Sequence, residues 1–522
     1  MLKGDPGAYF HPYWSPLLPA LVALTMKLTS PFHVPALLLA HGVIAISAIA
    51  GLACFAFFAA EWRYLLQSKI ENVSRVADVS RVLFGLALYL FAVIKLIGAE
   101  VVSPDIPVMA IVLALAGTSC RLASGRGGWR SAIGLGFLLA AGYFTKAALL
   151  PLGLLLVLLM ALLWFRGRAR RRYILVALLV YAAVAGAYIG ILSARQHRLT
   201  FGESGRLNYA WSVLGNAPMY AGWTQGSEAS GAPVHPLQVL GWHPAIFAFG
   251  NTTPGTVPLW YDPSYFYQGL KFHFSLRMQI RQLLRVPGQL AGPMRGSAFA
   301  ILLVLILLSV PVILHDLKRK PFGMPKLGAS WLMAWAVGAY CMYSLVSMKP
   351  RYVAPFFVLL VYLVAEELYT RLPLGAVRLG GGVLLAGTIL LCADLVVSQT
   401  VRRQLIPPGN SGKTQQVVAD NLKEMGVSSG EKIAVLADPF DVYYAFLDHL
   451  HVVVTIGFKG GNQSGNASEF WAMDAASREE LESKLASLGV VAIVSPSPCN
   501  AVAGPGWREV GSHEYCALRI SR

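Results

Sequence analysis

The sequence predicts a polytopic α-helical membrane protein of about ten spans plus an interfacial helical loop, followed by a small C-terminal α/β domain. Of its 522 residues 56% are hydrophobic and only 13% are charged, whereas soluble domains carry about 25% charged residues. Mean hydropathy is +0.57, and long apolar runs extend from Pro35 to Val397. These observations exclude disordered, fibrous and ordinary cytosolic proteins.

The spans are predicted from the length of each apolar run. They cover residues 35–61, 82–100, 106–121, 131–146, 149–165, 173–194, 298–316, 329–347, 351–369 and 380–399. Residues 1–399 are therefore expected to form the transmembrane domain, with a large loop at 195–296, and residues 400–522 to form a separate domain.

The distribution of basic residues predicts the orientation of the chain. The net charge is +17, but the tail from Thr400 holds fewer basic than acidic residues. Short connections on one side of the predicted membrane are rich in Lys and Arg, whereas the short connections on the other side hold only Lys146, Lys349 and Arg351. By the positive-inside rule the basic set is cytoplasmic: Arg63, Lys69, Arg75, Arg81, Arg121, Arg126, Arg130, Arg166, Arg168, Arg170, Arg171, Arg172, Lys318, Arg319, Lys320, Lys326, Arg371 and Arg378.

This orientation places the loop 195–296 and the tail on the exported side of a cell (inner) membrane. The basic excess then records topology, and no nucleic-acid partner is expected. The tail reads as helices at 415–425 and 477–488 with strands at 432–436, 490–494 and 515–520. Cys499 and Cys516 lie in this tail, where an oxidising compartment allows a disulfide, although their spacing alone leaves the pairing open.

Carboxylates occur at one short exported connection, in Glu100-Val-Val-Ser-Pro-Asp105. Acidic side chains at membrane depth are costly and are functional candidates by default. Asp105 also suits a helix cap, because Pro107 falls in the first turn of the next span. The two roles are compatible.

Cations occupy the same predicted side. Lys146 ends the fourth span and Arg351 opens the ninth, so either could hold a phosphate. The alternatives are a lysine that snorkels to the interface and an anchor made by Arg351 with Tyr352.

The long loop carries polar and basic candidates among many aromatic residues, which suit either the headgroup belt or stacking on sugars. Glu203 and Asp262 lie between Gly, Pro and aromatic residues, where ordinary turn residues also occur. Three arginines at 277, 281 and 285 recur every fourth residue. They predict a basic stripe on an interfacial helix within 272–284, facing anionic headgroups or a bound lipid phosphate. No Gly-rich phosphate loop precedes a helix on the predicted cytoplasmic side, which argues against ATP-driven work.

Together these phrases resemble the GT-C superfamily of membrane glycosyltransferases, of the kind related to protein O-mannosyltransferases and bacterial aminoarabinose transferases. The resemblance rests on residues 11–19, which begin His-Pro-Tyr-Trp, on 100–105, on Phe-Thr-Lys at 144–146 and on Lys-Pro-Arg-Tyr at 349–352. The loop phrases 201–209 and 259–265 also resemble those of bacterial members.

The resemblance implies transfer of a sugar, with inversion, from a polyprenyl-phosphate donor to an envelope glycan, lipid or protein. No cofactor is certain; positive charge or a divalent metal ion would stabilise the departing phosphate. The carboxylates considered for catalysis are Asp105, Asp5 and Glu100. The residues expected to bind substrate are His11, Lys146, Glu203, Arg206, Asp262, Arg351 and Tyr352.

The start of the sequence departs from this pattern. Members usually begin with a further span followed by their main catalytic aspartate, whereas Asp5 is the sole carboxylate before His11. We expect either a start site placed too late or a shortened chain, with Asp5 a loop neighbour rather than the base. Two other functions stay open, a lipid-linked sugar transporter or flippase and a catalytically silent glycan-binding relative. The absence of an internal repeat argues against the transporter.

Overall fold

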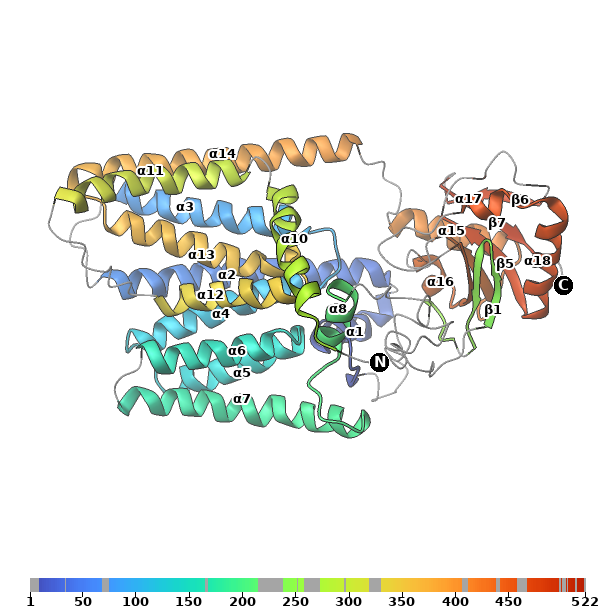
Figure 1. Ribbon diagram of the computed structural model, residues 1–522, viewed down its shortest axis with the longest axis horizontal. Coiled ribbons are helices and arrows are strands. Elements are labelled where there is room, and N and C mark those ends of the chain that lie inside the picture. The colour runs from blue at the N-terminus through green and yellow to red at the C-terminus, as the bar shows by residue number, and fades with distance from the viewer. Residues whose placement is uncertain are drawn as a thin grey trace. The chain divides into compact units, whose positions relative to one another are not determined.

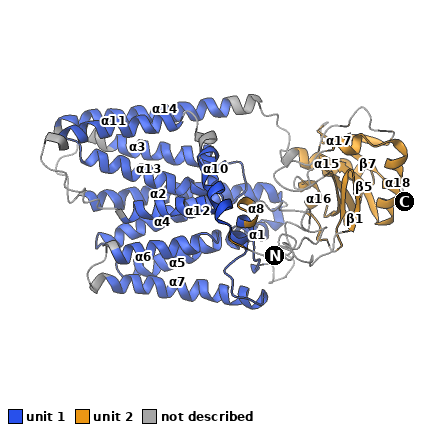
Figure 2. Ribbon diagram, in the orientation of Figure 1, with its two compact units in different colours: residues 1–209, 275–401 blue, residues 210–274, 402–522 orange. Residues whose placement is uncertain are grey.

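The structure is a computed structural model in which two compact units are described separately. Unit 1 comprises Met1–Tyr209 and Ser275–Val401, and unit 2 comprises Ala210–Phe274 and Arg402–Arg522 (Figure 2). The described residues are 9–32, 34–67, 75–164, 168–214, 238–250, 252–257, 273–294, 297–318, 330–405, 412–437, 442–457, 467–496, 499, 504, 506–511 and 514–520.

Unit 1 is a bundle of apolar helices (Figure 1). Seven helices in the described part of the chain are long and apolar enough to cross a membrane. The chain is therefore a multi-pass membrane protein, as predicted, while the count of about ten spans stays a prediction. The helices are α1 Leu17–Leu28, α2 Ala36–Gln67, α3 Arg75–Phe91, α4 Asp105–Ala123, α5 Trp129–Thr145, α6 Leu149–Leu159, α7 Arg168–Arg195, α8 Ser204–Ser212, α10 Leu276–Met294, α11 Ser297–Lys318, α12 Ser330–Val346, α13 Pro350–Thr370 and α14 Val377–Leu405.

Each predicted span coincides with one of these helices, but several details of the bundle were not predicted. Helix α1 is too short for a span, and it packs against α2 and α5. Two π-helical segments, η3 Ala92–Ile97 and η4 Met160–Trp164, continue α3 and α6. Short 3₁₀ turns η2 and η6 cover Ser30–Phe32 and Leu374–Ala376. Helix α10 runs crosswise to the long helices (Figure 1), as an interfacial helix would.

Helices α4 and α13 lie inside the bundle. In the most apolar window of each, 83% of α4 and 72% of α13 is buried, against 33% for α2 or α14. Pro350 forms the first turn of α13, where its missing N–H is harmless and its fixed φ favours the helix. The side chains that open these two enclosed helices are therefore held at the end of the bundle by rigid elements.

Unit 2 is built on one seven-stranded sheet of order β1-β2-β4-β3-β5-β7-β6. Strands β3, β4 and β5 are parallel, and the other pairs are antiparallel. The strands are β1 Gln238–Trp242, β2 Ala245–Ala248, β3 Lys432–Leu436, β4 His451–Ile456, β5 Val490–Ser495, β6 Trp507–Val510 and β7 Tyr515–Arg519, and the helices are α15 Gly412–Glu424, α16 Tyr443–Leu447, α17 Ser468–Trp471 and α18 Ala475–Ser487.

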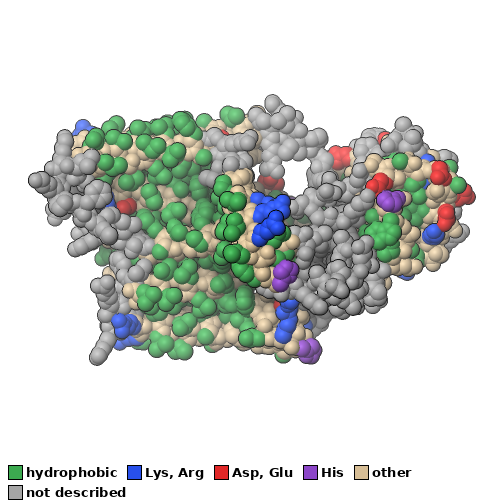
Figure 3. Space-filling model, viewed as in Figure 1, with side chains coloured by type: hydrophobic (Ala, Val, Ile, Leu, Met, Phe, Trp, Pro, Cys, Tyr) green, Lys and Arg blue, Asp and Glu red, His purple; other side chains and the backbone are tan. Residues whose placement is uncertain are grey.

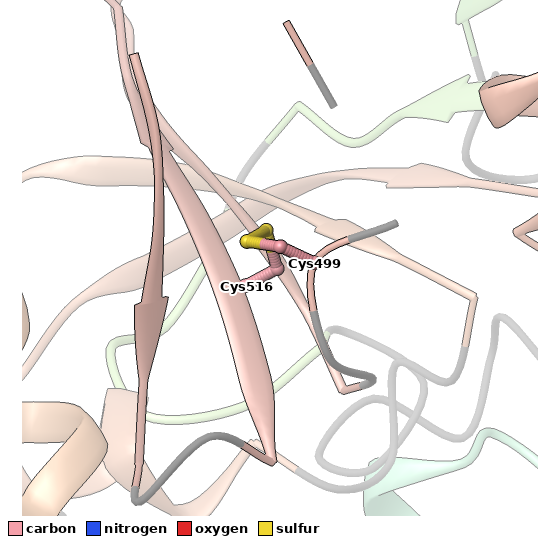
Figure 4. The surroundings of a disulfide bond; sticks show 2 residues. All are labelled: Cys499 and Cys516. Atoms are coloured by element: carbon pink, nitrogen blue, oxygen red, sulfur yellow. A yellow bond between two sulfur atoms is a disulfide. The ribbon is translucent and has the colours of Figure 1, made fainter. Parts of the chain in front are cut away.

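This sheet confirms the predicted α/β character of the tail and adds a contribution from the long loop. Strand β2 pairs with β4, with Phe247 opposite Thr455, so the loop residues 238–248 are part of the same sheet. A disulfide joins Cys499 to Cys516 on β7 (Figure 4). The two cysteines are therefore paired, a question that their spacing in the sequence left open.

Candidate functional site

The site is centred on the buried carboxylate of Asp105, the first residue of α4. Pro104 precedes it as the N-cap residue, and the backbone N–H of Asp105 donates to Ser103 Oγ at 3.4 Å. The Asp105 side chain is only 3% exposed, and the Ser103 hydroxyl lies 3.3 Å from its Oδ2. A negative charge at a helix N-terminus is favourable, but the ion pairs described next are the main contacts of this carboxylate.

Lys146 forms the first of these ion pairs, with Nζ 2.6 Å from Asp105 Oδ1. The residue follows α5 in an extended conformation, with its backbone N–H bonded to Gly142. Its ammonium also lies 3.6 Å from the centroid of the Tyr352 ring, a cation–π contact. Lys146 is thus held between a carboxylate and an aromatic face, and it does not extend freely to the interface.

Arg351 forms the second pair, with Nε 3.5 Å from Asp105 Oδ2. It follows Pro350 in the first turn of α13. Its side chain is 36% exposed, against 18% for Lys146, so the cluster opens on the side of Arg351. Asp105, Lys146 and Arg351 therefore converge, as the sequence reasoning expected.

Aromatic residues form the walls of this cluster. The rings of Tyr343 on α12 and Tyr352 lie 5.7 Å apart, and Lys146 Nζ is 5.9 Å from the Tyr343 ring. The Tyr343 hydroxyl is buried and has no hydrogen-bond partner among the described residues. Lys349 Nζ lies 5.9 Å from the Tyr352 ring and adds a further positive charge.

A second group of candidates lies in the segment that precedes α1. His11 Nδ1 accepts backbone N–H bonds from Tyr13 and Trp14, at 3.1 and 2.9 Å. The segment lines a hollow together with Tyr143 and Tyr188. His11 therefore shapes this turn with one ring nitrogen.

Tyr13 connects this segment to the cluster around Asp105. It interacts electrostatically with Tyr352 and Arg351, and the Asn208 side chain hydrogen-bonds its hydroxyl. Burial, the largest cause, raises the pKa of the Tyr13 phenol to about 12. Tyr13 consequently keeps its proton at neutral pH and can act as a donor.

Glu203 lies at the start of α8 and is tied to that same segment. Its backbone N–H donates to Pro12 O at 2.7 Å. Its buried carboxylate accepts from Thr200 Oγ1 at 2.8 Å and pairs with Arg198 Nη2 at 2.6 Å. The backbone contact of Glu203 with Pro12 holds the start of α8 against the segment that precedes α1.

The remaining predicted residues have fewer described contacts. Glu100 is exposed in the turn between η3 and α4, and its carboxylate approaches Gly98. Arg206 is partly buried on α8. Asp5 and Asp262 lie outside the described residues.

Sequence reasoning missed Tyr343 and Tyr13. Tyr343 lies in the last turn of the apolar helix α12, where a tyrosine alone does not indicate a site; only its packing against Tyr352 reveals it. Tyr13 belongs to the quoted phrase at 11–19, but that phrase singled out His11. The sequence also did not predict a polar network among the membrane helices, in which Lys95 Nζ lies 2.5 Å from Asp394 Oδ2 and 3.1 Å from Ser297 Oγ.

The described residues do not suit a metal ion. No group of three or more His, Cys, Asp or Glu side chains comes together within the described ranges. Asp105 instead lies beside cationic side chains. These neutralise the negative charge with which its carboxylate would bind a metal ion.

No protein-family model and no curated protein matches the sequence. Comparison with solved structures finds ArnT from Cupriavidus metallidurans bound to undecaprenyl phosphate, with a TM-score of 0.54 at 11% sequence identity, covering 98% of this chain and 88% of that chain. The apo form of the same protein gives 0.52 at 10% identity with the same coverage. An oligosaccharyltransferase from Archaeoglobus fulgidus gives 0.43 at 13% identity, covering 95% of this chain and 63% of that chain.

The likeness to ArnT over nearly the whole chain identifies the fold. It is the fold of ArnT, an architecture that agrees with the one predicted from the sequence resemblance. At this level of identity the comparison establishes architecture, and the chemistry must be argued from the side chains.

Proposed function

We propose that the protein is a glycosyltransferase that moves a sugar from a polyprenyl-phosphate donor to an acceptor of the cell envelope. One observation carries the proposal: Lys146 and Arg351 flank the buried Asp105 carboxylate at the end of the bundle. A phosphate binder and a carboxylate base are the two parts that such a transfer requires. ArnT, whose fold is shared, was crystallised with undecaprenyl phosphate.

The donor phosphate would bind Lys146 and Arg351. Asp105 cancels one of their two charges, and Lys349 nearby adds another. A phosphate that binds here competes with Asp105 for the ammonium of Lys146. The buried Tyr343 hydroxyl, which lacks a partner within the described part, would donate to a phosphate oxygen.

This exchange of partners prepares the transfer. Once Lys146 turns to the phosphate, the Asp105 carboxylate is able to accept the proton of an acceptor hydroxyl. The acceptor oxygen attacks the anomeric carbon, and the bond from that carbon to the phosphate oxygen breaks. The lipid phosphate departs with the electron pair, held by the two cations, and attack from the opposite face inverts the anomeric carbon.

The central test is Asp105→Asn in proteoliposomes supplied with polyprenyl-phosphate sugar and cell-envelope acceptors. Because a positioned base contributes about 10²–10⁴-fold to the rate, the variant should lose that factor in its transfer rate. Its protein level and membrane insertion should be unchanged. Glu100→Gln, in the same connection, should cost far less. Unchanged transfer by Asp105→Asn contradicts the proposal, and movement of the donor across the bilayer without product would identify a flippase instead.

We further propose that the site and unit 2 face the exported side of the cell membrane. The asymmetry of Lys and Arg between the connections supports this orientation. A reporter that is active only outside the cytoplasm, fused after Arg522, should be active. A reporter read only in the cytoplasm would reverse the orientation.

A further inference from the structure

Helix α10 presents three different faces. Because an α-helix turns about 100° per residue, Arg277, Arg281 and Arg285 form one stripe, and all three are exposed. Leu276, Ile280 and Leu283 form a second exposed stripe beside it. The third face packs on the bundle.

The packed face fixes the helix at the end of the bundle that holds the candidate site. Gln279 is buried and donates from Nε2 to Leu345 O at 2.9 Å, near the end of α12. Val286 and Leu290 pack on the main apolar core. Helix α10 is therefore held crosswise over the ends of the spans (Figure 1), and its other two faces stay open.

The open faces are ordered as a membrane surface requires. In Figure 3, the Lys and Arg side chains gather on one side of α10 and apolar side chains lie beside them, on the side of the bundle. Exposed fractions of 63% for Leu276 and 50% for Ile280 leave this apolar stripe uncovered. A helix lying at the boundary between headgroups and acyl chains buries such a stripe and points its cations at the phosphates.

The arginines have no anionic partner among the residues that the structure describes. No acidic residue occurs in Leu276–Met294, and none of the three forms an ion pair with any residue that the structure describes. The stripe from Arg277 to Arg285 is about 12 Å long. It is open and longer than one phosphate group, so it suits several neighbouring headgroups rather than one enclosed ligand.

We propose that α10 is a binding surface for the anionic phospholipids of the surrounding bilayer, through Arg277, Arg281 and Arg285. The proposal is independent of sugar transfer, because it concerns the bulk membrane and not the donor. Each arginine near an anionic surface strengthens binding about fivefold.

The test uses full-length protein in nanodiscs of phosphatidylcholine and phosphatidylglycerol, with a trace of photoactivatable lipid of one type or the other. Cross-linked peptides are mapped by mass spectrometry, without any sugar donor. Phosphatidylglycerol should label residues 276–294 at least about fivefold more than phosphatidylcholine. The triple variant Arg277→Gln, Arg281→Gln, Arg285→Gln should lose this excess, whereas the matched triple lysine variant should keep most of it.

Equal labelling by both lipids, or an excess that survives in the glutamine variant, overturns the proposal. Displacement of the label by one equivalent of undecaprenyl phosphate also overturns it, since the stripe would then be a donor site. If the glutamine variant fails to insert, labelling of the native protein is measured at increasing salt concentrations instead. The phosphatidylglycerol excess must fall as salt rises, and an excess indifferent to salt contradicts the proposal.

Discussion

The ammonium of Lys146 lies 2.6 Å from the carboxylate of Asp105. Asp105 is the first residue of α4, and Lys146 directly follows the last residue of α5. Their meeting shows that the start of α4 and the end of α5 contribute to one cluster of acidic and cationic side chains. The pair also means that both side chains are held in place before any ligand binds.

Lys146→Met should therefore affect donor use more than acceptor use. The variant removes one of two phosphate holders while leaving Asp105 with Arg351, so the KM for the polyprenyl donor should rise at least about tenfold, the loss expected for one charge-assisted hydrogen bond. Steady-state kinetics with each substrate varied in turn give the result. An effect confined to the acceptor would refute the assigned role, and Lys27→Met, at an exposed position on α1, is a suitable control.

A second ion pair, buried in the bundle, should be costly to break when only one of its two residues is replaced. Arg81 Nε lies 2.9 Å from Glu366 Oε1, and both side chains are nearly inaccessible. Arg81→Met or Glu366→Leu alone leaves an unpaired buried charge and should cost about 3–5 kcal/mol. The double variant should recover most of this loss, and thermal unfolding in detergent measures both. Equal destabilisation by the single and double variants would contradict the pairing.

The disulfide of unit 2 should stabilise that unit. Cys499 and Cys516 are 17 residues apart, and closing a loop of this size is worth about 3 kcal/mol in the chain-entropy model. Cys499→Ser should therefore make the sheet of unit 2 unfold at lower denaturant, with no change in the bundle. Hydrogen exchange read separately for strands and membrane helices distinguishes the two. The same loss in Cys341→Ser, a free cysteine, would show that the effect is not due to the bridge.

Helix α18 should loosen at acidic pH through its first turn. Asp474 accepts from the backbone N–H of Ser477 at 2.8 Å and from its hydroxyl at 2.9 Å. These hydrogen bonds, the backbone one first, lower the pKa of Asp474 below its ordinary value. The stabilisation is thus complete above the ordinary pKa of about 3.9 and is lost as the pH falls through the lowered one.

Hydrogen exchange of residues 475–487, corrected for intrinsic rates, gives the measurement. Protection should decrease below about pH 4 in the native protein. Asp474→Asn keeps a capping side chain without a titrating group, so its protection should not depend on pH in that range. A parallel decrease in the variant would assign the effect to another group.

The sequence predicts the helices well because each span is a local apolar run whose length reports the bilayer. It also predicts Asp105, Lys146 and Arg351 together, since topology alone assigns the ends of neighbouring spans to the same side. By contrast, Tyr343 enters the site only through the packing of α12 against α13. A single apolar segment does not reveal which of its faces is turned inward.

The sheet shows the same limit more strongly. Strand β2 pairs with β4, in the register Ala248 to Val454, and nothing local to either segment indicates the other. The boundary between the transmembrane domain and the tail, near Thr400, is predicted from the amino-acid composition, which changes there. The pairing of β2 with β4 across this boundary depends on tertiary structure. Composition therefore does not reveal that the loop and the tail share one sheet.

The shared sheet imposes an order on biosynthesis. Strand β2 is made long before His451–Ile456, the strand it needs beside it. At about 5–20 residues per second, the hairpin waits on the order of ten seconds or more while α10 to α14 are synthesised and inserted. During that interval its open edge is a target for chaperones or for wrong pairing, and a ribosome that stops before β4 leaves it permanently incomplete.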